Sequence, residues 1–489
     1  MTDNKRTLKY VITDEKGTPS LNIDESDDII NNTHMDQVVG TLIKYSGTGH
    51  YEPFLATHWV ASSDQLKWTF ELRPNISFED GTPITSINYI AGLKKAFRLY
   101  LKHSSPPSFE YLEGWDRFVK GDESSLGIKA IHENKIEFRF KKRPDGLLEF
   151  LAMPYFGAHH LNDFSGDQWK DPTKITASGA YKVSSLGKNS KLVLEKRPGF
   201  FSLKQNSPDQ VEILYKHFTE ASQLYPQNTI IYKKLDGTEK IPFGYRRILG
   251  TPNILIAIDL NQEKKESPFL DKGIRKWFQN SIRKAQEKVK IKSDNAILTQ
   301  TFYASPDQHI SSRIDNAVDF KKLKNKNIKI LTTGSLIPSE QEYAENLIRD
   351  VLSETPVNIE WTKENRSENN WVEKYFLNTD YDIRIKRVNI GSQLIEAAAR
   401  MMFCSKLGVA FPDPSNRIYE LMNDFSKCTS SNALVEYTQK FEDIILDESS
   451  VIPLFHSSLT WLFSEDINID QVTPTMSVPR FDLIQLKDE

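Results

Sequence analysis

The sequence predicts an α/β protein with more than one domain, and three observations lead to that class. The chain has 489 residues, which is long for one ordinary hydrophobic core and favours two or three domains. Before residue 250, short segments alternate polar and apolar side chains, as half-buried strands do. After residue 250, apolar strand-like runs alternate with amphipathic helical segments, which is typical of an α/β lobe.

Alternating strands dominate the first half. Residues 7–14 (TLKYVITD) and 67–73 (KWTFELR) have the period of two that a strand requires. FEDGTP at 78–83 predicts a turn, because Asp80-Gly81 and Pro83 favour one. Further expected elements are helical segments at 25–46 and 86–101, a strand at 135–141, a short helix ended by Pro154, and a hairpin from Tyr181 through Leu194.

The second half reads as strands and helices in alternation. The run NILIAIDLN is nearly all apolar, so it predicts a strand buried on both faces. The expected strands are 253–261, 327–334, 357–364 and 381–388, and the expected helices are 271–288 and 340–354.

Composition excludes several classes of protein. The net charge is −3, from 63 basic and 66 acidic residues, which predicts neither a nucleic-acid partner nor a polybasic membrane contact. No apolar run reaches the ~18 residues of a membrane helix. The polar start, MTDNKRTLKY, has no export signal, so the chain is either cytosolic or an exported protein whose signal has been removed.

Motifs for catalysis or cofactor binding are missing from the sequence. There is no phosphate-binding glycine motif, no nucleophile elbow and no zinc-protease motif. The pair His159-His160 favours a structural or solvent-facing role over a metal site. Cys404 and Cys428 are too few for a disulfide framework, and a single bridge and two buried thiols remain alternatives. We therefore expect no catalytic residues, no metal and no cofactor.

Residues 55–85, LATHWVASSDQLKWTFELRPNISFEDGTPIT, resemble the signature of the family 5 extracellular solute-binding proteins. These are the dipeptide- and oligopeptide-binding receptors of ABC importers. The residues in register with that signature are Leu55, Ala56, Trp59, Asp64, Trp68, Phe70, Leu72, Arg73, Phe78, Asp80, Gly81 and Pro83. The segments 178–201, 259–284, 381–385 and 451–463 are similar to later landmarks of the family, so the resemblance covers nearly the whole chain.

The resemblance implies a bilobal type II periplasmic-binding-protein-like fold, with an extra small α+β domain inserted in the first lobe. The implied bounds are 1–46, 178–250 and 456–489 for a discontinuous domain I, 47–177 for the insert, and 251–455 for a second α/β lobe that closes on domain I. Within the insert we expect Trp59, Trp68 and Asp80 to have structural roles and not to contact ligand.

The chain departs from the family where peptide-binding members carry an aspartate that pairs with the peptide's α-ammonium. That region reads YDIRIKRVNIGSQLIEAAARMMF here, with Val388 at the family's tryptophan position and Gly391 near the aspartate position. Removing the counter-ion of a buried ammonium costs several kcal/mol. The departure therefore favours an anionic or amine-blocked ligand.

Basic and amide side chains crowd this same stretch. We expect Ile383 and Ile385 on the buried side of the strand, with Arg384, Lys386 and Val388 opposite, before the chain enters a cleft-lining loop. The expected ligand-binding residues are Arg384, Arg387, Asn389, Ser392 and Gln393, since a guanidinium can hold a carboxylate in bidentate fashion. The alternative is that Arg384 and Lys386 lie on a solvent-exposed edge.

The leading interpretation is a non-enzymatic binding protein. It would capture a peptide or peptide-like solute between two lobes by hinge closure and deliver it to the membrane subunits of an ABC transporter. We expect a monomer with no nucleic-acid partner, located in the periplasm or extracellularly at the membrane. The alternative is a ligand-sensing or regulatory module of the same fold that acts on a partner protein.

Overall fold

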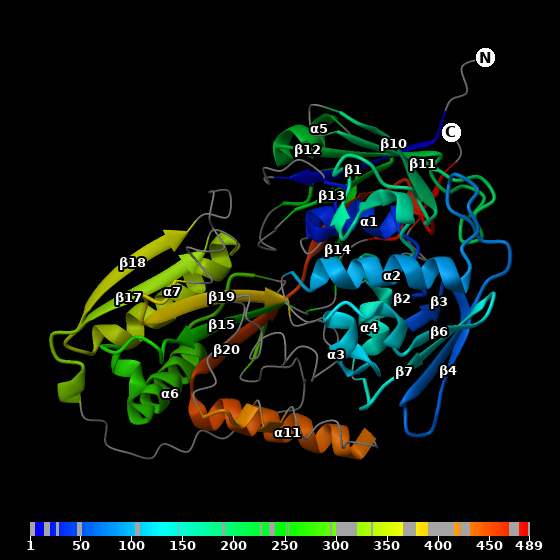
Figure 1. Ribbon diagram of the computed structural model, residues 1–489. Helices are drawn as coiled ribbons and strands as arrows, with labels where there is room; N and C mark the ends of the chain where they lie inside the picture. Colours follow the sequence, from blue (N-terminus) through cyan, green and yellow to red (C-terminus); the bar gives the residue numbers. More distant parts are fainter. Residues whose placement is uncertain are drawn as a thin grey trace. The chain divides into compact units, whose positions relative to one another are not determined.

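The computed structural model divides the chain into two compact units (Figure 1). The first comprises residues 1–233, 240–251 and 460–489, and the second comprises residues 234–239 and 252–459. The family resemblance implied lobe boundaries after residues 250 and 455, and the structure divides the chain after residues 251 and 459. The described residues are 5–13, 20–25, 29–45, 51–102, 108–144, 146–187, 191–224, 227–233, 240–250, 252, 254–293, 296–299, 320–333, 336–364, 378–389, 415–418, 420–421, 431–468 and 479–487.

Within the described residues, seven strands form the main sheet of the first unit, in the order β10-β11-β12-β1-β13-β21-β14. Strand β1 lies in the middle and runs parallel to β12 and β13. Tyr10, Val11 and Ile12 are all buried, so both faces of β1 are covered. The strands are β1 (Thr7–Thr13), β10 (Tyr181–Leu186), β11 (Leu192–Lys196), β12 (Gln210–Lys216), β13 (Thr229–Tyr232), β14 (Tyr245–Leu249) and β21 (Thr460–Ser464).

Helices and small strand pairs complete the first unit. The helix expected at 25–46 is shorter, since α1 spans Ile29–Val38. Helix α5 spans Phe218–Leu224. The strand pairs are β2 (Ile43–Tyr45) with β3 (Tyr51–Pro53), β8 (Phe164–Ser165) with β9 (Gln168–Trp169), and β22 (Ile467–Asn468) with β23 (Gln485–Leu486). The short 3-10 turns are η1 (Ile23–Glu25), η2 (Phe109–Tyr111), η3 (Glu123–Ser125), η4 (Pro154–Phe156) and η5 (Leu161–Asp163).

The signature segment belongs to a separate antiparallel sheet, with the order β4-β5-β7-β6 in the described residues. Trp59 stacks on Phe70 with ring centroids 6.2 Å apart, and the Trp68 indole donates a hydrogen bond to the carbonyl of Gln65 at 2.8 Å. The elements are β4 (Ala56–Ala61), β5 (Lys67–Leu72), β6 (Ile128–His132), β7 (Lys135–Arg139), α2 (Ser86–Tyr100), α3 (Trp115–Val119) and α4 (Leu147–Ala152). Both tryptophans are thus part of the scaffold, as expected.

The predicted Asp-Gly turn follows this sheet. The Asp80 carboxylate accepts the backbone N–H of Thr82 at 2.9 Å, and Gly81 has a φ of +88°, which favours glycine. Three residues later, Thr85 caps α2 by accepting the backbone N–H of Asn88 at 3.2 Å. Asp80 therefore has a structural role at the turn.

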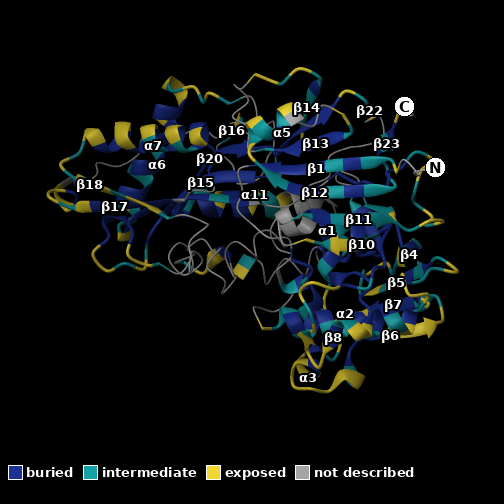
Figure 2. Ribbon diagram, turned by 90° about the horizontal axis from the view of Figure 1, so that it is seen from above, coloured by how far each residue is buried: buried dark blue, intermediate teal, exposed yellow. Residues whose placement is uncertain are grey.

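Six described strands form the sheet of the second unit, in the order β16-β20-β15-β19-β17-β18. Strand β15 is central and buried along its whole length, as the dark blue of Figure 2 shows. It runs antiparallel to both β19 and β20, whereas β17 is parallel to β18 and β19. The strands are β15 (Ile254–Leu260), β16 (Ala296–Leu298), β17 (Asn327–Thr333), β18 (Asn358–Glu364), β19 (Ile383–Asn389) and β20 (Val451–Ser457).

Three helices belong to the described part of this unit, with two short turns, η6 (Pro268–Leu270) and η7 (Phe320–Lys322). Helix α6 (Lys272–Lys288) begins at Asp271, whose carboxylate accepts the N–H of Ile274. Helix α7 (Pro338–Ser353) connects β17 to β18, and its Tyr343 contacts Phe455 of β20 at a centroid distance of 5.7 Å. Helix α11 spans Ser431–Glu448 and packs against α6 and β20.

A buried charge cluster lies on β15 and β19. Asp259 and Arg384 are direct partners in the antiparallel register, and Oδ2 of Asp259 accepts hydrogen bonds from Nε and Nη2 of Arg384 at 3.0 and 2.7 Å. The Lys386 ammonium lies 3.3 Å from the same oxygen, and the Tyr381 hydroxyl donates to it at 3.1 Å. Burial would raise the pKa of Asp259, but Lys386 and Arg384 outweigh it and lower that pKa.

This cluster rules out the alternative that Arg384 and Lys386 lie on a solvent-exposed edge of the sheet. Arg384 and Lys386 are 3% and 0% exposed, and β19 has a neighbouring strand on each side. The predicted alternation of β19 is correct, because Arg384 and Lys386 lie on the face opposite Ile383 and Ile385. Both faces are nevertheless buried, since Asp259 on the adjacent strand compensates the cations.

The remaining expectations from the sequence concern the histidine pair, metal binding, membrane helices and the two cysteines. His159 is buried with its ring 3.0 Å from the Tyr155 carbonyl, and burial lowers its pKa to about 4. In the described residues, no group of three or more histidine, cysteine or acidic side chains is placed to hold a metal. No helix there has the length and apolarity to cross a membrane. Cys404 and Cys428 lie outside the described residues.

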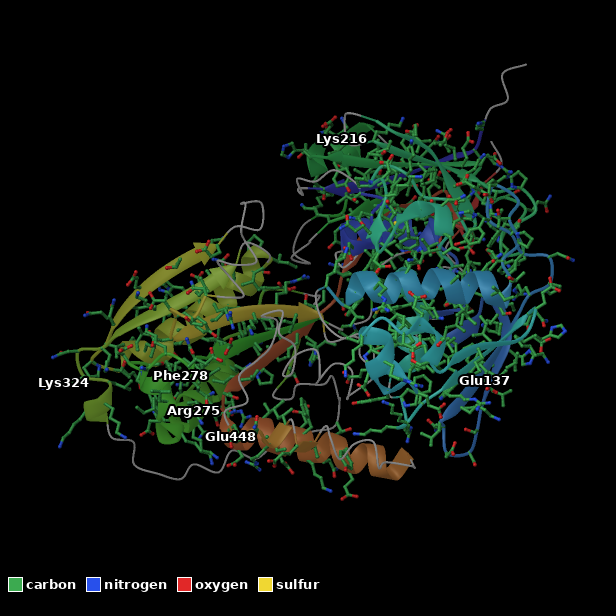
Figure 3. All side chains as sticks on the ribbon, viewed as in Figure 1. Glu137, Lys216, Arg275, Phe278, Lys324 and Glu448 are labelled. Atoms are coloured by element: carbon green, nitrogen blue, oxygen red, sulfur yellow. The ribbon has the colours of Figure 1, made fainter. Side chains whose placement is uncertain are left out.

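Two arginines of α6 are both buried but differ in their contacts. Arg275 donates to the carbonyls of Glu448, Phe269 and Leu270 at 2.8, 2.9 and 3.1 Å, and Figure 3 shows it beside the end of α11. For Arg283, which is 6% exposed, no hydrogen bond or ion pair occurs in the described chain, and burial lowers its pKa. A buried guanidinium without a partner is unfavourable.

The two arginines make a matched test of this difference. We expect Arg275→Met to lower the free energy of unfolding by ~3–5 kcal/mol, because carbonyls and Glu448 lose their donor. We expect Arg283→Met to raise it by about 1 kcal/mol, because methionine fills similar space without a buried charge. Urea unfolding of both variants measures the effect, and equal destabilisation by the two substitutions would contradict it.

The lowered pKa of Lys386 predicts a pH dependence of stability. Burial, only partly offset by Asp259, lowers the pKa of Lys386 from 10.5 to about 7. Between these values the unfolded chain binds a proton that the folded chain lacks, so the folded state gains stability as pH rises. The penalty is complete below pH 7 and absent above pH 10.5.

Lys386→Met removes this titration. The wild type should gain stability between pH 7 and pH 8.5, whereas the variant has no lysine to titrate at this position. We therefore expect the free energy of unfolding of the wild type, measured relative to that of the variant, to rise by ~1.5 kcal/mol over this range. Urea unfolding at both pH values measures it. A constant difference across that range would show that Lys386 keeps its proton in the folded state.

Candidate functional site

One edge of the second unit's sheet gathers several features that point to a site. Chain segment 252–459 begins with β15 and ends with β20, and Ile254 and Ser457 are partners in register. Ile254 is also the partner of Asn389, the last residue of β19. Segment 252–459 therefore begins and ends at the edge of the sheet where β19 ends.

The same edge carries the start of α7. Strand β17 is parallel to β19, so both end there, and α7 begins shortly after β17. In α/β sheets, ligands bind outside the carboxyl ends of the parallel strands, where helix N-termini and loops converge. We call the residues Asn389, Ile254, Ser457 and the first turn of α7 (338–340) the carboxyl edge.

Arg387 lies near this edge on the face that α7 covers. It shares its face of β19 with Ile383 and Ile385, and its Nε is 3.6 Å from Oε2 of Glu340. The Arg387 side chain is 14% exposed and that of Glu340 is fully buried. Two unit charges at this separation attract by about 5 kcal/mol at an effective dielectric constant of about 20.

Glu340 is held in place by the helix that carries it. It is the third residue of α7, after Pro338, and its Oε2 accepts the backbone N–H of Ile337 at 3.2 Å. An acidic side chain is favoured here, because it satisfies a free N–H and interacts well with the helix dipole. The local sequence IPSE could have revealed this helix start, but not its contact with Arg387.

Each partner keeps a buried polar atom without a hydrogen bond. These atoms are Nε of Arg387, a donor, and Oε1 of Glu340, an acceptor, and neither makes a hydrogen bond among the described residues. Leaving such groups unpaired costs about 1–3 kcal/mol each. The pair therefore keeps one buried donor and one buried acceptor without a hydrogen bond close to the carboxyl edge.

The other expected site residues fall in different places. Arg384 pairs with Asp259, five positions before Asn389, which corresponds to ~17 Å along a strand. Its guanidinium is thus a partner of the core carboxylate and is remote from the edge. Asn389 ends β19 at the edge, one residue beyond the expected strand. Ser392 and Gln393 lie outside the described residues.

Comparisons with known proteins place this chain in a family. The family model "Bacterial extracellular solute-binding proteins, family 5 Middle" matches residues 50–309. The periplasmic oligopeptide-binding protein OppA of Salmonella typhimurium is 28% identical over 192 residues, covering 37% of this chain and 34% of that protein. The probable deoxycholate-binding protein YgiS of Escherichia coli is 25% identical over 185 residues, covering 35% and 34%.

The fold likeness extends over the whole chain. The crystal structure of Haemophilus influenzae OppA in complex with RPPGFSPFR has a TM-score of 0.76 and covers 99% of this chain and 100% of that one, at 14% sequence identity. The sequence matches to the curated relatives, by contrast, span only about a third of their length. The family model alone covers more than half of the chain, and the protein belongs to the family 5 bacterial extracellular solute-binding proteins.

Proposed function

We propose that the chain captures a peptide or peptide-like solute and delivers it to an ABC transporter. The observation that carries this proposal is the carboxyl edge, where Arg387 and the first turn of α7 lie beside the points at which segment 252–459 begins and ends. A ligand bound at that edge is next to both connections. Rotation about them would close the protein on its ligand.

Peptide is the preferred class of ligand. Main-chain hydrogen bonds can hold an extended peptide without reading its side chains, and OppA of Salmonella typhimurium is named for oligopeptide binding. YgiS is named for deoxycholate, so the ligands of relatives differ in chemistry. The choice of ligand is therefore argued from the residues of this chain.

The proposed ligand-binding residues are those of the edge and of the segment after it. They are Arg387, Asn389, Ser392 and Gln393. The stretch after Asp382 lacks an acidic residue until Glu396, so an α-ammonium has no carboxylate partner from this segment. An acidic or amine-blocked ligand suits the guanidinium of Arg387 better.

The proposed partners and location follow from the family. Its members are described as extracellular, and the curated relatives above are named periplasmic. We infer that this chain acts as a monomer outside the cytoplasmic membrane, where the closed form would meet the membrane subunits of an importer. Binding, and not catalysis, is the proposed activity.

Removal of the Arg387 guanidinium tests the proposal. We expect Arg387→Ala to weaken binding of an acidic or amine-blocked ligand by ~1.5–3 kcal/mol, the scale of a hydrogen bond to a charged group. Calorimetry with N-acetylated pentaalanine measures the dissociation constants. Arg349→Ala is the matched control, since Arg349 also lies near a glutamate, Glu345, but on the exposed side of α7. Equal affinity of wild type and Arg387→Ala would contradict the proposed site.

A further inference from the structure

The charge of the Arg387 subsite depends on Glu340, a residue 47 positions earlier in the chain. Arg387 has one ion-pair partner within the described residues, the fully buried carboxylate of Glu340. One guanidinium and one carboxylate sum to zero net charge. A ligand carboxylate placed against Arg387 would thus also face the negative charge of Glu340 behind it.

The unpaired atoms of the pair favour the same conclusion. Nε of Arg387 is a buried donor without an acceptor, and Oε1 of Glu340 is a buried acceptor without a donor. An amide group offers one carbonyl acceptor and one N–H donor, and so complements both atoms, as a water molecule does. A carboxylate offers only acceptors, and an ammonium offers only donors.

We propose that Glu340 is a positioning residue that makes the Arg387 subsite electrically neutral, so that the subsite accepts an uncharged C-terminal amide of an amine-blocked ligand and disfavours a C-terminal carboxylate. Glu340 acts through Arg387: it fixes the guanidinium and cancels its charge, and it is itself held by the N–H of Ile337. The inference rests on the proposed function. It selects the amine-blocked, uncharged ligand over the anionic one.

Two peptides that differ only at one end provide the test. They are N-acetylated pentaalanine with a free carboxylate and the same peptide with a C-terminal carboxamide, and calorimetry gives a dissociation constant for each. We expect the wild type to bind the carboxamide about tenfold or more tightly than the acid. Glu340→Gln, which keeps the shape of the side chain, leaves the charge of Arg387 uncompensated and should reverse the preference in favour of the acid.

A control separates charge at this site from charge on the helix. Glu342→Gln removes a carboxylate from the same turn of α7, but Glu342 is 60% exposed and its partner Lys292 is 3.8 Å away. We expect this variant to keep the wild-type ratio of the two affinities. Loss of folding alone would not reverse a preference between two ligands, so the reversal is specific to the proposed role.

The outcomes are distinguishable. If both peptides bind the wild type and Glu340→Gln leaves their ratio unchanged, the neutral subsite is wrong while peptide capture stands. If the wild type binds the acid as tightly as the carboxamide, the neutral subsite is also wrong, even if Glu340→Gln does not fold. If neither peptide binds the wild type, capture of amine-blocked peptides fails and this inference fails with it.

Discussion

The position of β15 between β19 and β20 is the constraint on which the second unit depends. Because β15 opens segment 252–459 and β20 closes it, and both pair with each other in register, this segment must begin and end at one edge. The parallel strand β17 and its helix α7 bring a helix N-terminus to the edge where β19 ends. The candidate site is therefore a consequence of strand order before any side chain is considered.

Two groups of buried charges lie on opposite faces of this sheet, and their compositions suit different roles. In the Asp259 cluster, Oδ2 of Asp259 accepts hydrogen bonds from Arg384 and Tyr381. In the pair Glu340–Arg387, Nε of Arg387 lies 3.6 Å from Oε2 of Glu340, and each side chain keeps one buried atom without a hydrogen bond in the described residues. Since Glu340 lies in the first turn of α7 at the carboxyl edge, whereas Asp259 and Arg384 are remote from that edge, the second group is the better candidate for contacting a ligand.

The sequence was sufficient for the elements whose signal is local. The alternation in KWTFELR predicted β5, the apolar run NILIAIDLN predicted β15, and Asp80-Gly81 predicted the turn. The faces of β19 were also predictable from its period of two. These patterns depend only on residues that are close together in the sequence, so they can be recognised from the sequence alone.

Contacts between residues that are far apart in the sequence could not be predicted from these local patterns. Alternation separates Arg384 from Ile385, but it does not show that Asp259, 125 positions earlier, makes the second face a buried one. Likewise, the pattern of β19 contains no sign that Glu340 of α7 lies beside Arg387. Both pairings follow from strand order and helix placement, which a single sequence without an alignment does not specify.

Hydrogen exchange with and without N-acetylated pentaalanine amide tests most directly whether the carboxyl edge binds ligand. At saturation, we expect slower exchange in segments 336–342 and 386–389, and unchanged exchange at the opposite edge of the same sheet, in 261–266 and 325–328. Protection confined to 261–266 and 325–328, with none at 336–342 or 386–389, would show that ligand does not bind at the carboxyl edge.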